Sequence, residues 1–249
     1  MSQKLLGIDV GGSSVKAGVV DVTTGHLLGE VISAPTPKPS TPERLAAVIA
    51  GLAARLPQAQ GRVGVAFPSV VHHGVVRTAA NIDHSWLGAN GAAVVGHALN
   101  RPVVFLNDAD AAGLAEMRWG AGMGVTGTAI MLTFGTGIGS ALFVNGRLFP
   151  NTELGHLELN GMDAEKFASA HVRTSLGLDF PAWIERVNQY LARIHALLWP
   201  DVIILGGAVS ERYAEFSTLL KCDAELRPAH FAGQAGVIGA AMATVGDAS

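Results

Sequence analysis

The chain has 249 residues, of which 49% are hydrophobic, and a formal net charge of −3. This length and composition predict a folded protein with room for two modest hydrophobic cores, and the near-balance of charge argues against a general nucleic-acid binder. The only cysteine is Cys222. It excludes a disulfide within the chain and a cysteine-based zinc site, and it is typical of a protein in the reducing cytoplasm.

Two stretches could be mistaken for targeting or membrane segments. The N-terminus places Asp9 inside any would-be apolar signal segment and has no cleavage pattern, so we expect no secretory signal. The uncharged stretch from Trp119 to Gly146 is long enough to mimic a membrane span. Because it contains eight glycines and divides into two short β-prone runs, we expect two buried strands there instead.

The first half of the chain is predicted to alternate strands and helices. Three strands joined by Gly turns come first, at residues 4–10, 14–21 and 26–33. A Pro-rich surface link at 34–42 leads to a helix that has Thr41 as its cap and Pro42 in its first turn. Its apolar face comprises Leu45, Val48, Ile49, Leu52 and Leu56. The remaining elements are a strand at 62–67, a helix at 86–99, a buried strand at 102–106 and a helix that Asn107-Asp108 opens and that ends near Trp119.

The second half repeats this theme. The predicted strands lie near 126–133, 138–144 and 202–205, and the predicted helices at 163–171, 180–198, 210–220 and 235–245. Alternation of this kind predicts an α/β fold with a mainly parallel sheet in each of two lobes and a hairpin at the start of each. We expect a small N-terminal lobe at 1–108, joined by the C-terminal helix at 235–249, and a large C-terminal lobe at 109–234.

A strand–Gly turn–strand pattern occurs twice, at residues 5–21 and 130–146, with Gly11 aligned on Gly135. A pattern written twice suggests two related half-domains. Glycine lets bare backbone N–H groups approach an anion closely, so two such turns suit a chain of phosphates. Neither sequence is a P-loop, because no lysine in the chain follows a glycine.

Each turn carries candidate phosphate ligands. In the first, Gly11 and Gly12 are expected to adopt positive φ, and Asp9 at the strand end could hold a hydrated Mg²⁺. The other donors in the two turns are Ser13, Ser14, Lys16, Thr136 and Gly137. An ordinary hairpin turn is the alternative for one such loop alone, and the matching second loop lowers its weight.

Polar residues elsewhere suggest a hydroxylated substrate. Asn107 and Asp108 directly follow a buried strand, at the edge where open α/β sheets bind ligands, and Asp108 can accept a proton from a hydroxyl nucleophile. Helix capping is the alternative for this pair. Four more candidates suit polyol recognition better than zinc, with surface decoration as the alternative for any one of them. They are Asn81, Glu153, His156 and Glu165.

Taken together, these segments resemble the ROK family of sugar kinases, within the actin-like ATPase superfamily. The resemblance runs from DVGGSSVKAG (9–18) to AGVIGAAM (235–242). It implies a two-lobed actin-like (ribonuclease H-like) α/β fold with a central cleft. Four motifs are most similar to those of bacterial polyphosphate glucokinases and glucomannokinases. They are LNDADAAGLAE (106–116), FGTGIGSALF (134–143), PNTELGHLE (150–158) and ILGGAVS (204–210).

The resemblance also implies roles. Asp108 would be the general base that takes the proton from the sugar 6-hydroxyl, and Gly206-Gly207 would lie against the nucleoside. The other sugar hydroxyls would be bound by Asn81, Asn107, Glu153, His156 and Glu165. The implied reaction is phosphoryl transfer from ATP or inorganic polyphosphate to glucose, with mannose as a further candidate, and Mg²⁺ would bridge the donor phosphates.

The chain departs from many family members in two places. The Cys-rich zinc motif that follows the Gly-His pair in many relatives is replaced by LELNGMDAEK, so the resemblance implies no zinc and leaves His156 to face the sugar. The first loop has Ser13-Ser14-Val15-Lys16 where many relatives have Thr-Lys. Lys16 and Arg77 are candidate cations for a polyphosphate groove.

Several alternatives stay open at this point. The enzyme could use ATP alone, or the chain could be a non-catalytic sugar-binding regulator or an actin-like assembly protein. Regulators of the family carry an extra N-terminal helix-turn-helix, for which a first strand beginning by about Lys4 leaves no room. We expect a cytoplasmic monomer or homodimer that binds neither nucleic acid nor membrane.

Overall fold

The computed structural model describes residues 3–80 and 82–245. The chain forms two compact units. Unit 1 comprises residues 1–119 and 234–249, and unit 2 comprises residues 120–233. The sequence placed the boundary after Asp108. In the structure, helix α3 (Asp108–Trp119) belongs to unit 1, because it packs along helix α7 (Ala235–Met242).

Unit 1 is built on a mixed sheet of six strands, of which five follow the order β3-β2-β1-β5-β8. The strands are β1 (Lys4–Val10), β2 (Ser14–Asp21), β3 (His26–Leu27), β4 (Ile32–Pro35), β5 (Val63–Phe67) and β8 (Val103–Asn107). The hairpin β1–β2 is antiparallel, and β1, β5 and β8 are mutually parallel. A separate small ribbon pairs β6 (Val71–His72) with β7 (Val75–Val76).

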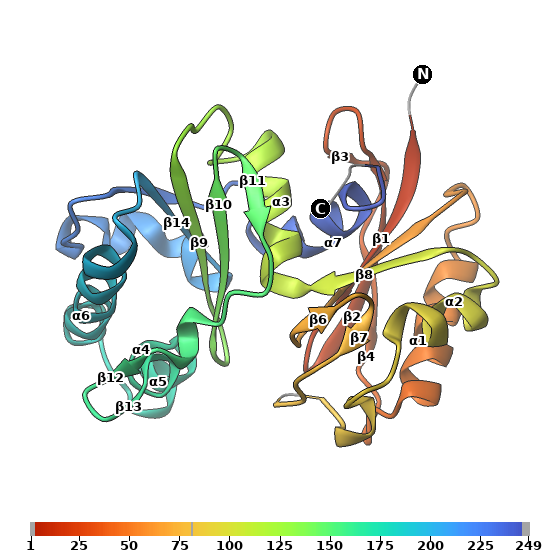
Figure 1. Cartoon of the computed structure of the whole chain (residues 1–249), viewed down its shortest axis with the longest axis horizontal. Coiled ribbons are helices and arrows are strands. Elements are labelled where there is room, and N and C mark those ends of the chain that lie inside the picture. The colour runs from red at the N-terminus through yellow and green to blue at the C-terminus, as the bar shows by residue number, and fades with distance from the viewer. Residues whose placement is uncertain (1–2, 81, 246–249) are drawn as a thin grey trace. The chain divides into compact units, whose positions relative to one another are not determined.

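Two helix layers cover the two faces of this sheet (Figure 1). Helices α1 (Pro42–Ala54) and α2 (Gly91–Leu99) lie on one face, over a core that includes Leu6, Ile8 and Ile49. Helix α7 lies on the other face. There, a Cβ atom on Gly7 or Gly64 would overlap a backbone carbonyl oxygen of α7, at Val237 and Ala240 respectively. The strand period of two explains this division, since Gly7 alternates with the two core residues on either side of it.

Unit 2 repeats the plan. Its sheet has the order β11-β10-β9-β14-β15. The strands are β9 (Thr128–Phe134), β10 (Ile138–Val144), β11 (Arg147–Phe149), β14 (Val202–Gly206) and β15 (Glu225–Pro228). An antiparallel hairpin, β9–β10, is again followed by parallel strands, β9–β14–β15. The duplicated hairpin of the sequence therefore begins each sheet. The sheets are mixed, so the expectation of mainly parallel sheets was wrong: short antiparallel edge strands extend both hairpins.

The long helix α6 (Phe180–Leu198) packs against the sheet of unit 2 (Figure 1). Asp179 caps it by accepting a hydrogen bond from the Ala182 N–H at 2.9 Å. Trp183 is fully buried on its apolar face and donates its indole N–H to the carbonyl oxygens of Ala168 and Ser169. This contact ties α6 to the short helices α4 (Ala164–Ala168) and α5 (Ala170–Ser175).

Several predicted elements are divided or replaced by shorter ones in the structure. The strand expected at 26–33 is interrupted around Gly29, whose φ of +100° suits glycine. The helix expected at 163–171 divides at Ser169, which is extended and caps α5 through the Val172 N–H. Short 3-10 helices occupy Ala208–Glu215 and Ser217–Leu219 where one α-helix was expected, and another covers His84–Trp86 before α2 begins at Gly91.

The uncharged stretch from Trp119 to Gly146 forms β9 and β10, as expected. Among the described residues, no helix is long and apolar enough to cross a membrane.

The packing of α7 on the sheet gives a stability prediction. Gly64→Ala should lower the free energy of unfolding by about 2–3 kcal/mol or more, because the added methyl group meets the helix backbone rather than a flexible side chain. Gly51→Ala in α1 is the matched control. Nothing lies within 4 Å of a Cβ there, and it should stabilise by about 0.5–1 kcal/mol. Urea unfolding of the three proteins measures both effects, and a loss below about 1 kcal/mol at Gly64 would contradict the packing.

Candidate functional site

The first glycine loop, residues 11–13, is held open by its neighbours. The Gly11 N–H donates to the Ser14 carbonyl oxygen at 2.9 Å, and the Thr36 hydroxyl donates to the Gly11 carbonyl oxygen at 2.6 Å. Gly12 and Ser13 are exposed, and a Cβ on Gly12 would contact nothing within 4 Å. Gly11 and Gly12 do not have positive φ, so that expectation was wrong. The absence of side chains here provides access to the backbone rather than an unusual turn.

A pocket of about 410 Å³ opens beside this loop in unit 1. It is lined by Gly12, the segment from Thr36 to Ser40, Ala80, Ile82 and Asp83. The Pro-rich link therefore forms a wall of a pocket that the loop also lines, a role that its composition did not indicate. Asn81 lies outside the described residues, although both of its sequence neighbours line this pocket.

Asp9 stands in β1 opposite Lys16 of β2. Burial raises the pKa of the Asp9 carboxyl, and the nearby Lys16 ammonium opposes that rise. The carboxylate also packs on Gly236 at the start of α7, where a Cβ would come within 2.7 Å of Asp9 Cγ. A buried carboxylate whose charged form is disfavoured gains from a nearby cation, so Asp9 fits the expected water-mediated Mg²⁺ contact.

Asn107 and Asp108 lie at the carboxyl end of β8, where α3 begins. Asn107 is buried; its Oδ1 accepts from the Asp110 N–H at 3.0 Å, and its Nδ2 donates to the Ser69 carbonyl oxygen at 3.2 Å. Asn107 thus caps α3, which is the alternative that the sequence left open. The Asp108 carboxylate accepts from the Ala109 N–H at 2.8 Å, which fixes its direction at the helix start.

Strand register brings these carboxylates to one edge of the sheet in unit 1. Asp9 of β1 and Leu106 of β8 both pair with Ala66 of β5. Since neighbouring strands are about 4.8 Å apart, the backbones of Asp9 and Leu106 are roughly 10 Å apart. Asp108 follows two residues beyond Leu106, so a candidate cation ligand and a candidate base share this edge.

The second glycine loop, residues 135–137, is the counterpart in unit 2. Thr136 is exposed, and the Gly135 carbonyl oxygen accepts from the His171 N–H at 3.0 Å. Gly207, with φ of +84°, approaches the end of β9 so closely that a Cβ would overlap the Phe134 carbonyl oxygen. The Gly206-Gly207 turn and the second loop are therefore neighbours.

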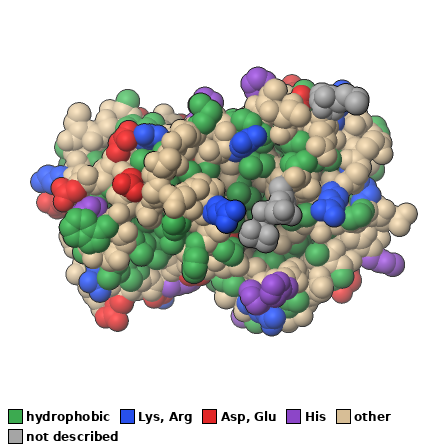
Figure 2. All heavy atoms as spheres, turned by 45° about the horizontal axis from the view of Figure 1, so that its top comes forward, with side chains coloured by type: hydrophobic (Ala, Val, Ile, Leu, Met, Phe, Trp, Pro, Cys, Tyr) green, Lys and Arg blue, Asp and Glu red, His purple; other side chains and the backbone are tan. Residues whose placement is uncertain are grey.

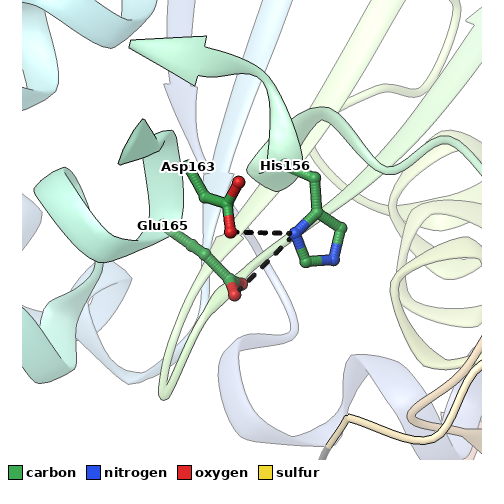
Figure 3. Close-up of side chains that lie close together, drawn as sticks. All are labelled: His156, Asp163 and Glu165. Atoms are coloured by element: carbon green, nitrogen blue, oxygen red, sulfur yellow. Dashed lines mark ion pairs between the residues drawn. The ribbon is translucent and has the colours of Figure 1, made fainter. Parts of the chain in front are cut away.

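A cluster of three carboxylates surrounds His156 in unit 2. His156 Nδ1 lies 3.7 Å from Asp163 Oδ2 and 4.0 Å from Glu165 Oε1, and its Nε2 lies 3.8 Å from Glu153 Oε2. Figure 3 shows the Nδ1 edge of the ring turned toward Asp163 and Glu165. The structure thus brings together three of the candidates for sugar binding, Glu153, His156 and Glu165, and it adds Asp163.

Local structure places this cluster. A Cβ on Gly155 would overlap the Ile138 carbonyl oxygen, so only glycine lets the 3-10 turn Leu154–His156 lie on β10. The Leu154 N–H donates to the Ser140 hydroxyl at 3.0 Å and strengthens the same contact. Glu165 is also seated on the second loop, because its Oε2 accepts from the Ile138 N–H at 3.4 Å and occupies the space above Gly137.

Asp163 was missed, although the sequence held a signal for it. Asn160 and Gly161 both have positive φ and join β12 (Glu158–Leu159) to β13 (Met162–Asp163). Asn-Gly is the strongest short hairpin signal, because both residues accept the conformation of a two-residue turn. The hairpin folds Asp163 back toward His156.

The same cluster also offers potential ligands to a metal ion. The candidate ligand atoms of His156, Asp163 and Glu165 all lie within 4.8 Å of one another. However, Asp163 Oδ2 already accepts the Lys166 ammonium at 2.8 Å, and a metal ion would have to displace that cation. One histidine and two carboxylates are also a poor donor set for zinc. The residues therefore do not fit a zinc ion well.

Three comparisons with known proteins bear on this site. Residues 5–173 match the ROK family. The chain belongs to the ROK family. It is 47% identical to a polyphosphate glucokinase of Mycobacterium tuberculosis (strain CDC 1551 / Oshkosh) over 97% of this chain and 91% of that protein. It is 44% identical to the polyphosphate glucokinase of Mycobacterium leprae over 97% of this chain and 74% of that protein.

Among solved structures, the chain matches an inorganic polyphosphate/ATP-glucomannokinase from Arthrobacter sp. strain KM. The TM-score is 0.93 at 46% identity, covering 96% of this chain and 97% of that one. A ROK family glucokinase from Streptomyces griseus, in complex with glucose and AMPPNP, matches with a TM-score of 0.79 at 25% identity over 96% and 98%. The expected fold class, an α/β protein of the actin-like ATPase type, is confirmed.

The electrostatics of Glu153 yield a prediction. Burial and the nearby Glu165 carboxylate raise the pKa of Glu153, and His156 opposes the rise. A raised pKa means that the folded state binds the proton more tightly, so this carboxyl destabilises the fold as pH rises through that pKa. Glu153→Gln should therefore raise Tm slightly at neutral pH.

Thermal unfolding of Glu153→Gln and the parent at pH 5 and pH 8 measures the effect, and the gain should be larger at pH 8. Glu43→Gln, at an exposed first-turn position of α1, is the control and should leave Tm unchanged. A Tm difference for Glu153→Gln that is the same at both pH values would contradict a raised pKa at Glu153.

Proposed function

We propose that the chain transfers a phosphoryl group from inorganic polyphosphate or ATP to the 6-hydroxyl of glucose. The observation that carries this proposal is the 44–47% identity to polyphosphate glucokinases over 97% of the chain. The structural match to a polyphosphate/ATP-glucomannokinase supports both donors. Mannose differs from glucose only at the 2-hydroxyl, and we include it as a second acceptor.

Asp108 acts as the general base. Its carboxylate is oriented by the Ala109 N–H, so it can receive the proton of the 6-hydroxyl as the oxygen attacks the terminal phosphorus of the donor. The bond from that phosphorus to its bridging oxygen breaks, and ADP or the shortened polyphosphate leaves. Asn107 supports it by fixing the end of β8 to Ser69 and capping α3. Asn107 therefore has a structural role in addition to any contact with the sugar.

Glu153, His156 and Glu165 bind the other sugar hydroxyls, together with Asn81. Carboxylate oxygens accept hydrogen bonds from hydroxyl groups, and an imidazole can donate or accept. Glu165 also contacts the second glycine loop through Ile138, which would couple the sugar ligands of unit 2 to the donor loop.

The two glycine loops hold the donor phosphates through backbone N–H groups and hydroxyls. In the first loop the ligands are Gly12, Ser13, Ser14 and Lys16, while Gly11, whose N–H is bonded to Ser14, leaves room for the phosphates. In the second loop they are Thr136 and Gly137. Gly206-Gly207, beside the second loop, faces the nucleoside of ATP. Asp9 would hold Mg²⁺ through water, and the ion would supply charge neutralisation for the donor phosphates, since phosphoryl transfer depends on positioning and electrostatics. The single cysteine and the choice of ATP as a donor fit the cytoplasm.

Removing the base should slow the chemical step. Asp108→Asn should lower kcat about 10²–10⁴-fold, the usual contribution of a positioned base, with glucose still bound. Coupled detection of glucose 6-phosphate gives kcat, and calorimetry gives glucose affinity. Glu43→Gln, another acid in a helix first turn, is the control and should keep full activity. An Asp108→Asn variant that retains more than about a third of the parental kcat would contradict the role of Asp108 as general base.

The donors should respond differently to salt. Polyphosphate is a long polyanion whose binding releases counterions, so its KM should rise steeply with ionic strength, while the KM for ATP rises less. On the face drawn in Figure 2, Lys and Arg side chains stand apart rather than forming a continuous stripe, so the attracting charges must be local. Lys16 and Arg77 are our candidates.

Both donor KM values should be measured from about 50 to 300 mM KCl, a range over which screening changes strongly. Equal salt slopes would contradict a polyanion groove. No product from polyphosphate at low salt would leave a strictly ATP-dependent glucokinase, and no product from either donor would favour a non-catalytic sugar-binding regulator.

A further inference from the structure

We propose that Asp163 is a positioning residue: its carboxylate fixes the ring orientation and the tautomer of His156, so that His156 Nε2 can accept a hydrogen bond from a sugar hydroxyl. This inference rests on the proposed sugar kinase function and assigns a role to a residue outside the expected ligand set.

One carboxylate oxygen of Asp163 has two positively charged or hydrogen-donating neighbours. Asp163 Oδ2 lies 2.8 Å from the Lys166 Nζ and 3.7 Å from His156 Nδ1, so it is shared between a cation and the imidazole. Lys166 lies one turn along α4 from Asp163 and is mostly exposed, with 68% of its side chain accessible. The ion pair with Lys166 holds the carboxylate in place beside the ring.

The chemistry follows from the imidazole. A neutral imidazole has one N–H donor and one acceptor nitrogen, and the partner of the first decides which nitrogen is left for the second. Asp163 and Glu165 both face Nδ1, and an ionised carboxylate only accepts hydrogen bonds. Two carboxylates thus face Nδ1, and one, that of Glu153, faces Nε2. The balance favours the tautomer with hydrogen on Nδ1, which leaves Nε2 as the acceptor.

Nε2 points away from both of these carboxylates (Figure 3) and lies 3.8 Å from Glu153 Oε2. A vicinal diol could then donate one hydroxyl to Nε2 and the neighbouring hydroxyl to Glu153. Asp163 need not touch the sugar for this arrangement. It acts through His156 alone, which distinguishes it from the expected sugar ligands.

Asp163 pairs its charge with Lys166 of its own helix at 2.8 Å but does not use it to cap that helix. It occupies the N-cap position of α4 but makes no side-chain hydrogen bond to the helix backbone. Asparagine is as good an N-cap residue as aspartate. The substitution Asp163→Asn therefore removes the negative charge, and with it the exposed ion pair with Lys166, while keeping the shape of the side chain, and the variant should fold.

The test compares Asp163→Asn with Glu158→Gln. Glu158 is the exposed carboxylate that pairs with Asp163 across the β12–β13 hairpin, so its removal changes the local charge equally. We expect Asp163→Asn to raise the glucose KM about 3- to 10-fold, the loss expected for one hydrogen bond, and to leave the donor KM and Tm nearly unchanged. Glu158→Gln should change none of these. Lys166→Met should give a smaller rise in glucose KM, because Asp163 keeps its charge but loses its anchor.

A spectroscopic readout separates positioning from a general structural effect. Nitrogen-15 NMR of the His156 ring, at a pH where the ring is neutral, should show hydrogen on Nδ1 in the parent and loss of that preference in Asp163→Asn. This measurement needs no activity, so it stays informative even if the parent fails to phosphorylate glucose, which would refute the proposed function instead.

An unchanged glucose KM in Asp163→Asn overturns the proposal, and so does an unchanged tautomer. Elemental analysis of protein purified without added metal supplies a third check. Stoichiometric zinc in the parent that is lost in Asp163→Asn would make Asp163 a metal ligand and would likewise overturn the proposal.

Discussion

The close backbone-to-backbone approach of α7 to the sheet is the constraint on which the structure of unit 1 depends. Three glycines make it possible: a Cβ on Gly7, Gly64 or Gly239 would overlap a carbonyl oxygen of α7 or α3. A helix from the end of the chain is thereby fixed against β1, β5 and α3. The same contact covers part of Asp9, since its carboxylate lies on Gly236 at the start of α7. The close packing of this helix thus contributes to the raised pKa of Asp9, a candidate cation ligand.

The ends of the parallel strands also bring candidate site residues together. Parallel strands deliver their carboxyl ends to one edge, and the register of β1, β5 and β8 places Asp9, Asn107 and Asp108 there without any long loop. Unit 2 uses its own hairpin and its own parallel strand in the same order, so that the second glycine loop and Gly207 come together. Two copies of one topology thus supply one glycine loop to each unit.

Much of the fold and of the candidate site could be predicted from the sequence, and the wrong or missing predictions have physical causes. The strand–turn–strand repeat predicted both hairpins, because a period of two and a glycine turn are local signals. Edge strands β11 and β15 were missed, since three or four residues carry too little pattern. The positive φ expected at Gly11 and Gly12 was wrong, because composition does not distinguish a need for space from a need for an unusual conformation. Glu153, His156 and Glu165 were predicted as a set, whereas Asp163 depends on a tertiary fold-back that the Asn160-Gly161 turn creates.

The two carboxylates on opposite sides of His156 show why such contacts matter. Asp163 is held by Lys166, and the pKa of its carboxyl is lowered by that ammonium. Glu153 lies 3.8 Å from His156 Nε2, and burial raises the pKa of its carboxyl. One histidine therefore lies between a carboxylate that is firmly ionised and one whose charge costs the fold stability. A hydroxylated ligand that donates to Glu153 would relieve that cost, while the charge at Asp163 is already compensated. The ring thus has a charge-compensated carboxylate on one side and a carboxylate without such compensation on the other. This asymmetry suits the proposed binding of vicinal hydroxyls.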